Sequence, residues 1–306
     1  MNLREWALPF YTILMQLAVG ALLVLWILRW LGSYRFSLQE INRVLRNPLL
    51  IISFTVVVAM IAAHLHLSRP LYSFYAIRNF RSSWLSREIV FTVMFFMAVG
   101  TLLFFSRFRQ EQHRLITQLG WLAAALGLTV VYCMAKIYLL PTQLAWNSPI
   151  VVAAFYITTL LLGTMTTACL LILDLKFAEI QKAEDLELQV RVARFALSWL
   201  SFAAFFMVAV DIAITFFQLG QFAQGDATLQ TSLQLLFELY MPLFVARLIL
   251  LAGAPLWMGY AVYRTHRLMS PPQELLPPVY FCCLLILVAE IMGRFLFYAT
   301  HIRLGI

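Results

Sequence analysis

Eight ionisable side chains interrupt the apolar stretches of this 306-residue chain and could together line one polar pocket. They are His64, His66, Glu88, Lys136, Asp211, Arg247, Glu290 and Arg294. Successive apolar stretches would cross a membrane in alternating directions, so residues late in even-numbered stretches and early in odd-numbered ones lie toward one side. A charged side chain inside a bilayer is costly and usually faces a cavity, a partner or a binding site. The sequence therefore predicts a polar pocket near one side of the membrane.

A histidine and a glutamate frame the connection between the second and third apolar stretches. His64 and His66 are two residues apart, about 200° around a helix, so only one of them can face the pocket. Glu88 begins the next stretch and would lie at the same depth. A quinol needs hydrogen bonds to both hydroxyls and acceptors for both protons when it is oxidised, which a histidine and a carboxylate can provide. We therefore expect a quinol site, although a histidine at a helix end is more often only an interfacial hydrogen-bonding residue.

The last apolar stretch carries a second group of polar residues. Glu290 and Arg294 are spaced for an intrahelical ion pair, and Tyr298 and His301 continue the same stripe. A neutralised pair that only fixes helix packing is the alternative to a binding role. Asp211 could neutralise either Lys136 or Arg247, and the sequence leaves that choice open.

The composition is that of an integral membrane protein. Hydrophobic residues make up 63% of the chain and charged residues 12%, against about 45–50% and about 25% in soluble proteins. A membrane-spanning helix needs roughly 20 apolar residues. Eight such stretches are present, which predicts an all-α polytopic protein with a single transmembrane domain over residues 1–306. They cover about residues 7–31, 49–67, 88–105, 115–140, 150–175, 195–218, 240–263 and 279–299.

The connections differ strongly in their Lys and Arg content. Thirteen of these residues fall in the odd-numbered connections, and six fall on the other side with the two termini. The positive-inside rule then places both termini outside. We expect the charged segment 176–194 to extend a helix into the cytoplasm, and the polar segment 219–232 to form an outer loop.

The second connection breaks this charge rule, because it is predicted to be outside yet is rich in arginine and aromatic residues. Its arginines are Arg69, Arg78, Arg81 and Arg87. Arginine and aromatic residues are enriched in protein interfaces, so we expect this segment to dock a partner protein. Anchoring at the membrane surface is the alternative.

The sequence supports metal binding and transport less than it supports quinol binding. None of the four cysteines stands in a C-x-x-C spacing, which is typical of packing residues. Only His64 or His66 together with His301 could ligate a haem from facing helices. We therefore expect neither haem nor an iron–sulfur cluster in this chain, with a b-type cytochrome or a transporter as alternatives. No internal repeat is visible, which weakens the transporter alternative.

Four segments resemble the membrane anchor subunits of dimethyl sulfoxide reductase, the DmsC family. They are the start with Glu5, Trp6, Gln16 and Gly20, the sequence HLSRP at 66–70, LSREI at 85–89, and AEIMGRFLFYATH at 289–301. The eight predicted helices match throughout. Where the family commonly has Gly-Ser before the proline, this chain has Ser68 and Arg69.

The resemblance implies a subunit of a bacterial inner-membrane complex of anaerobic respiration. Such an anchor has no catalytic metal. It oxidises menaquinol and passes electrons to an iron–sulfur subunit, which feeds a molybdopterin catalytic subunit. In this family the quinol-binding histidine and glutamate correspond to His66, not His64, and to Glu88. We expect Lys136, Arg247, Glu290 and Arg294 to complete that pocket electrostatically.

The charge distribution yields a testable topology. A reporter fused after Arg46 should give a cytoplasmic signal, and one fused after Gln230 an external signal, because basic connections stay on the cytoplasmic side. The opposite pattern would place the polar pocket at the inner side of the membrane.

Overall fold

The computed structural model describes residues 3–65, 75, 77–181 and 185–302, and these residues form helices and short turns without a strand. Eight of the helices are long and apolar enough to cross a membrane. They are α1 (Leu3–Gly32), α2 (Leu38–Leu65), α3 (Trp84–Phe108), α4 (His113–Tyr138), α5 (Pro149–Ile180), α6 (Leu186–Gln224), α8 (Met241–Arg267) and α9 (Leu276–Ala299). The predicted all-α, eight-span architecture is therefore confirmed, and the chain is a multi-pass membrane protein.

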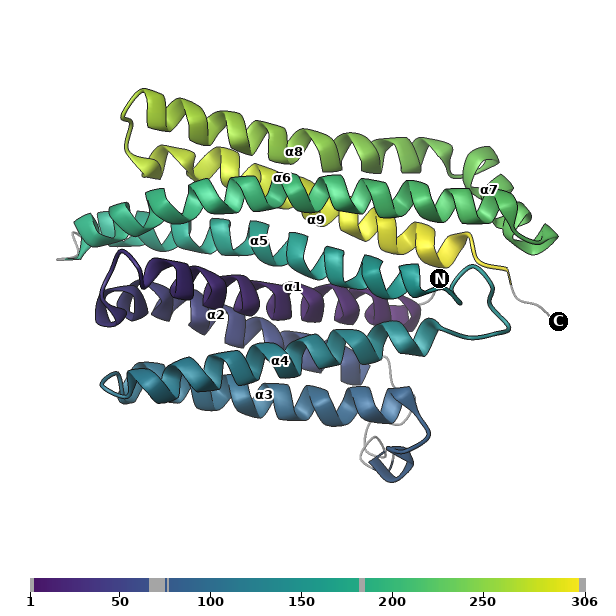
Figure 1. Ribbon diagram of the computed structural model, residues 1–306, viewed down its shortest axis with the longest axis horizontal. Coiled ribbons are helices and arrows are strands. Elements are labelled where there is room, and N and C mark those ends of the chain that lie inside the picture. Colours follow the sequence, from purple (N-terminus) through teal and green to yellow (C-terminus); the bar gives the residue numbers. More distant parts are fainter. Residues whose placement is uncertain (1–2, 66–74, 76, 182–184, 303–306) are drawn as a thin grey trace.

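Helices α1 and α5 form the centre of the bundle. Both bury most of their residues, whereas α3 and α6 bury few. The α3–α4 hairpin packs on one side of this centre, and α6, α8 and α9 pack on the other (Figure 1). The candidate site must therefore be built around the two central helices, where several elements converge.

Two glycines bring the central helices into backbone contact. A Cβ atom on Gly20 of α1 would collide with the backbone carbonyl of Thr159 in α5, and one on Gly163 would collide with the backbone of Gly20. Small residues of this kind allow membrane helices to approach closely, where van der Waals packing and interhelical hydrogen bonds hold them together. The close approach also lets the Gln16 side chain of α1 donate to the Phe155 carbonyl of α5 over 2.8 Å.

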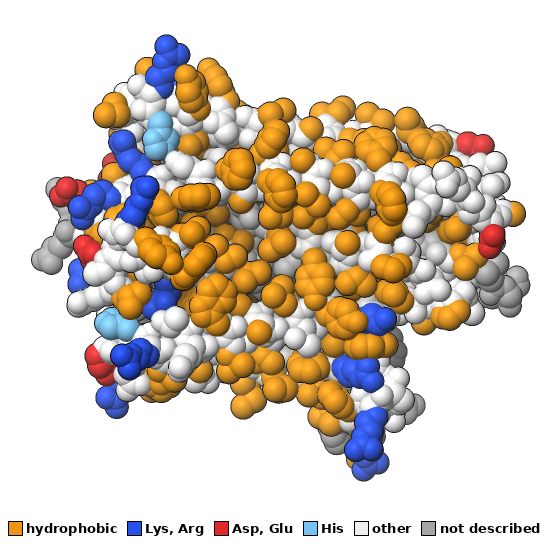
Figure 2. Space-filling view, viewed as in Figure 1, with side chains coloured by type: hydrophobic (Ala, Val, Ile, Leu, Met, Phe, Trp, Pro, Cys, Tyr) orange, Lys and Arg blue, Asp and Glu red, His pale blue; other side chains and the backbone are white. Residues whose placement is uncertain are grey.

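The two ends of the bundle differ in charge. Helix α1 begins and α9 ends at the same end, which we call the terminal end (Figure 1). Most Lys and Arg side chains gather at the opposite, basic end, and a smaller group lies at the terminal end beside α3 and α4 (Figure 2). This distribution agrees with the loop count in the sequence. That the terminal end faces outward stays a prediction.

Several helix boundaries differ from the predicted stretches. Helix α2 begins at Leu38 rather than near residue 49, because Ile41, Val44 and Leu45 already form a buried face ahead of the apolar core. Helix α5 ends at Ile180 and helix α6 begins at Leu186. Both helices therefore extend into the charged segment, which confirms the predicted helical extension on both sides of residues 182–184. Those three residues lie outside the described part of the chain.

The prediction that residues 219–232 form a loop is wrong. Helix α6 continues to Gln224, and a further helix, α7 (Ala227–Glu238), follows after a two-residue turn. Leu229, Leu233 and Leu236 recur at helical spacing and pack against the bundle, so a polar but amphipathic sequence forms a helix. The turn at Gly225 is therefore a better site for the external reporter than Gln230.

A short 3₁₀ helix, η2 (Pro272–Leu275), precedes α9.

The glycine contact predicts an unequal response to two similar substitutions. Gly20→Ala should lower the stability of the purified protein by about 1–3 kcal/mol, because an added methyl group forces two close-packed backbones apart. Gly100→Ala in α3 is the matched control, since a Cβ there meets no atom within 4 Å. Thermal unfolding in detergent measures both. Equal transition temperatures for the two variants would contradict the backbone contact.

Candidate functional site

Glu88 lies in the first turns of α3, at the terminal end of the bundle. Ser83 caps this helix by accepting a hydrogen bond from the Ser86 amide, which fixes where the helix starts and so the depth of Glu88. The Glu88 side chain is only 5% exposed. The Tyr11 hydroxyl of α1 lies close to its carboxyl group and 3.4 Å from Thr92 Oγ1.

The histidines of the second connection are only partly described. His66, the predicted partner of Glu88, and Arg69 lie outside the described residues. His64 is exposed, and its ring Nδ1 lies 2.8 Å from the carbonyl oxygen of Met60 in its own helix. The prediction that His64 does not face the pocket agrees with this position.

Lys136 lies beside the start of α3. Its Nζ is 5.4 Å from the centre of the Trp84 ring, and the Arg87 guanidinium lies over the same ring at 4.1 Å. Lys136 thus lies at Trp84, four residues before Glu88 on α3, and is not part of the Asp211–Arg247 pair described below.

A pair of tyrosines occupies the space between α4 and α9. The hydroxyl groups of Tyr138 and Tyr298 are hydrogen-bonded to each other. Tyr138 is close enough to Glu88 and Arg294 to interact electrostatically with both. Sequence reasoning missed Tyr11 and Tyr138 because both are uncharged and sit in apolar stretches, where tyrosine is common at membrane interfaces.

Arg294 crosses from α9 to the central helices. It donates to Gln16 Oε1 over 2.6 Å, and its guanidinium lies 4.1 Å from the centre of the Phe155 ring. The predicted intrahelical ion pair with Glu290 is wrong, since among the described residues no such pair joins them. Gln16 and the Phe155 ring face Arg294 from the adjacent central helices, and these interhelical partners take the place of the local one.

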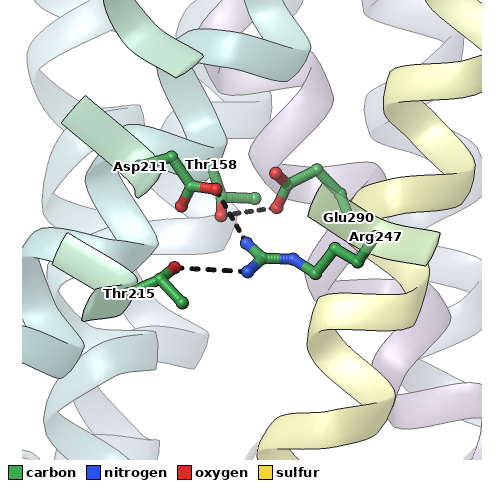
Figure 3. Close-up of polar contacts among 5 residues, drawn as sticks. All are labelled: Thr158, Asp211, Thr215, Arg247 and Glu290. Atoms are coloured by element: carbon green, nitrogen blue, oxygen red, sulfur yellow. Dashed lines mark hydrogen bonds and ion pairs between the residues drawn. The ribbon is translucent and has the colours of Figure 1, made fainter. Parts of the chain in front are cut away.

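The partner of Asp211, left open by the sequence, is Arg247. Arg247 Nη2 of α8 lies 2.8 Å from Asp211 Oδ2 of α6, with both side chains almost fully buried. Nη1 of the same arginine donates to Thr215 over 3.2 Å. Gly293 of α9 makes room for Arg247, because a Cβ there would lie 2.6 Å from its Nε. Figure 3 shows the guanidinium between Asp211 and Thr215.

Glu290 lies close to this pair. Its Oε2 accepts a hydrogen bond from Thr158 of α5 over 2.7 Å (Figure 3). Thr158, Asp211, Arg247 and Glu290 line a cavity of about 130 Å³ between α5, α6, α8 and α9. The predicted pocket residues therefore form two groups, one around Glu88 and one around Glu290, with Arg294 and the tyrosine pair between them.

An apolar groove of about 290 Å³ runs between α1 and α9 at the terminal end. Phe10 and Ile291 line it and are exposed on the surface of the bundle. Tyr298, whose hydroxyl joins Tyr138, lines the groove as well. The lining of this α1–α9 groove thus combines exposed apolar side chains with one member of the tyrosine pair.

The predicted docking arginines take different positions. Arg78 and Arg81 are exposed, and Arg78 lies 4.9 Å from the Tyr75 ring centre. Arg87 instead donates to the carbonyl oxygens of Phe80 and Arg81 over 2.9 and 2.6 Å. Arg87 therefore holds the segment against the start of α3, while Arg78 and Arg81 are available to a partner.

Comparison with known proteins gives a consistent result over almost the whole sequence. Residues 1–300 match the family described as DMSO reductase anchor subunit (DmsC). The YnfH subunit of an anaerobic dimethyl sulfoxide reductase of Escherichia coli is 28% identical, over 99% of this chain and 96% of that protein. A subunit of the anaerobic dimethyl sulfoxide reductase of Haemophilus influenzae is 27% identical, over 99% of this chain and 97% of that protein.

Proposed function

The chain belongs to the family of dimethyl sulfoxide reductase anchor subunits, and we propose that it binds and oxidises menaquinol at the terminal end of the bundle. In this proposal it sits in a bacterial inner membrane and holds an iron–sulfur subunit and a molybdopterin catalytic subunit outside. Oxidation of one quinol breaks two O–H bonds. Two electrons pass to the iron–sulfur subunit, and two protons pass to acceptors in this chain.

The main support for the proposal is that Glu88, among the described residues, is buried without an ion pair. It is a buried carboxyl group, and in the described part of the chain no Lys or Arg forms an ion pair with it. A carboxylate whose only role is structural is usually paired with a cation. One that instead has a tyrosine hydroxyl close to it, as Glu88 has Tyr11, can accept a proton from a quinol hydroxyl. We propose His66 as the second acceptor.

The α1–α9 groove supports the same assignment. A quinol carries a long prenyl tail, which favours an apolar channel open to lipid. The groove offers such a channel, and Tyr298 forms part of its wall. Glu88 is near enough to interact electrostatically with Tyr298. We propose that the tail lies in the groove and the headgroup lies between Glu88 and the tyrosine pair.

Docking of the iron–sulfur partner is proposed at Arg78 and Arg81. Both are exposed in the segment that leads into α3, ten and seven residues before Glu88 in the sequence. Electron transfer requires the quinol and the nearest cluster to be close together, and this proximity meets that requirement. An acidic surface on the partner would complement the two arginines.

The quinol site predicts a specific defect in two variants. Glu88→Gln and His66→Ala should each lower quinol-dependent turnover of the membrane-bound complex by about 100-fold, the effect of losing a positioned proton acceptor. Artificial dyes that donate electrons directly to the partner subunits should support normal turnover. Glu238→Gln, an exposed carboxylate at the same end of the bundle, and His64→Ala are the matched controls. Normal quinol oxidation by both Glu88→Gln and His66→Ala would refute the site.

The docking surface predicts loss of the partner without loss of the anchor. Replacing Arg78 and Arg81 together by Glu should release the iron–sulfur subunit into the soluble fraction, because the attraction becomes a repulsion. Arg109 and Arg114, exposed at the basic end, provide the control pair. Fractionation followed by immunoblotting measures both proteins. A complex that stays membrane-bound and active would show that the segment only anchors in lipid.

A further inference from the structure

The cavity around Glu290 has a polar lining that the proposed quinol site does not use. Figure 3 draws five of the polar side chains that line it, contributed by α5, α6, α8 and α9. They are Thr158, Asp211, Thr215, Arg247 and Glu290. Such a concentration of polar groups inside a membrane bundle is costly unless it serves a function.

Two polar atoms of this cluster lack a protein partner. Within the described residues, Glu290 Oε1 and Arg247 Nε are buried and form no hydrogen bond, and the two residues are only 4% and 8% exposed. Leaving a buried polar atom unsatisfied costs about 1–3 kcal/mol, and more when the group is charged. The cluster is therefore incomplete without a further ligand.

The chemistry of the two atoms specifies that ligand. The carboxylate oxygen of Glu290 needs a donor, and the N–H of Arg247 needs an acceptor. A water molecule supplies both, and the cavity volume of about 130 Å³ holds roughly four waters at about 30 Å³ each. Two carboxylates and two guanidinium groups surround the site, from Asp211, Glu290, Arg247 and Arg294, so no net charge calls for a bound ion.

The cavity also extends toward the terminal end. Asp211 and Phe222 of α6 both line it, and eleven residues of helix correspond to about 16 Å. Trp146, Leu236 and Thr300, from elements at this end, also line it. The cavity thus runs from the buried charges to the end of the bundle where the proposed quinol oxidation takes place.

We propose that this cavity is a water-filled chamber through which Glu290 exchanges protons with the aqueous phase at the terminal end. The proposal rests on quinol oxidation at the Glu88 site, which releases two protons that must leave the membrane. Glu290 faces Thr158 of α5, Asp211 of α6, Arg247 of α8 and Arg294 of its own helix. A proton passed on from the Glu88 site breaks its O–H bond there and forms one at the free oxygen of Glu290, from which it leaves through the waters, so no bond other than O–H is formed or broken.

Infrared difference spectroscopy of the complex in lipid nanodiscs tests the chamber independently of turnover. A step in pH should produce a carboxylic C=O band that shifts in D₂O and disappears in Glu290→Gln. The same band should remain in Glu238→Gln. Absence of a band that depends on Glu290 would refute the proposal.

Turnover measurements separate this proposal from the quinol site itself. Glu290→Gln should slow quinol-dependent turnover about 10-fold and alter its pH profile, with KM for quinol and the dye assay unchanged. If Glu88→Gln is defective but Glu290→Gln has normal turnover and a normal pH profile, the chamber is refuted and the quinol site stands. If Glu88→Gln and His66→Ala are both normal, the quinol site itself is refuted.

A second variant, which changes no charge, distinguishes loss of the water route from a folding defect in Glu290→Gln. Ala154→Leu fills part of the cavity, so it should slow turnover and D₂O exchange of the Glu290 band. Ala153→Leu, on the exposed face of the same helix, should leave both unchanged. Normal exchange and turnover in Ala154→Leu would contradict a water-filled route.

Discussion

A charged side chain in the interior of a membrane protein has to find its partners on other helices, and this constraint organises the bundle. Asp211 and Arg247 join α6 to α8, and Arg294 joins α9 to α1 through Gln16. Thr158 joins α5 to the carboxylate of Glu290. Removing one member of a buried ion pair typically costs about 3–5 kcal/mol, because the other charge is left uncompensated. The polar contacts therefore fix the register of helices whose apolar faces alone would tolerate sliding.

The residues proposed for partner docking and quinol binding lie together at the terminal end, and contacts between helices hold them there. Trp84 and Arg87 begin α3 and hold the arginine-rich segment, and Glu88 follows directly. The backbone contact between Gly20 and Gly163 sets the spacing of α1 and α5. Each function proposed for this end, namely partner docking, quinol binding and proton exit, thus depends on helices that the buried polar groups hold in place.

The sequence predicts the architecture of the bundle more accurately than it predicts the contacts between side chains. Eight apolar stretches and the asymmetric charge of the connections are properties of single segments, and the helices follow them. Local spacing predicts a Glu290–Arg294 pair, but Arg294 reaches Gln16 and Phe155 instead. A choice between local and distant partners depends on which helices are neighbours, which spacing alone does not specify. Tyr11 and Tyr138 were missed because an uncharged tyrosine in an apolar stretch gives no signal of a site, and α7 was missed because its few leucines lie among polar residues.

Photolabelling with an azido-menaquinone in the intact membrane complex tests the central claim most directly. Peptide mapping should locate the label on the terminal halves of α1, α3 and α9, near Tyr11, Glu88 and Tyr298. An excess of unlabelled menaquinol should prevent the labelling. Specific labelling confined to the basic end, or found only on the partner subunits, would contradict a quinol site in this part of the anchor.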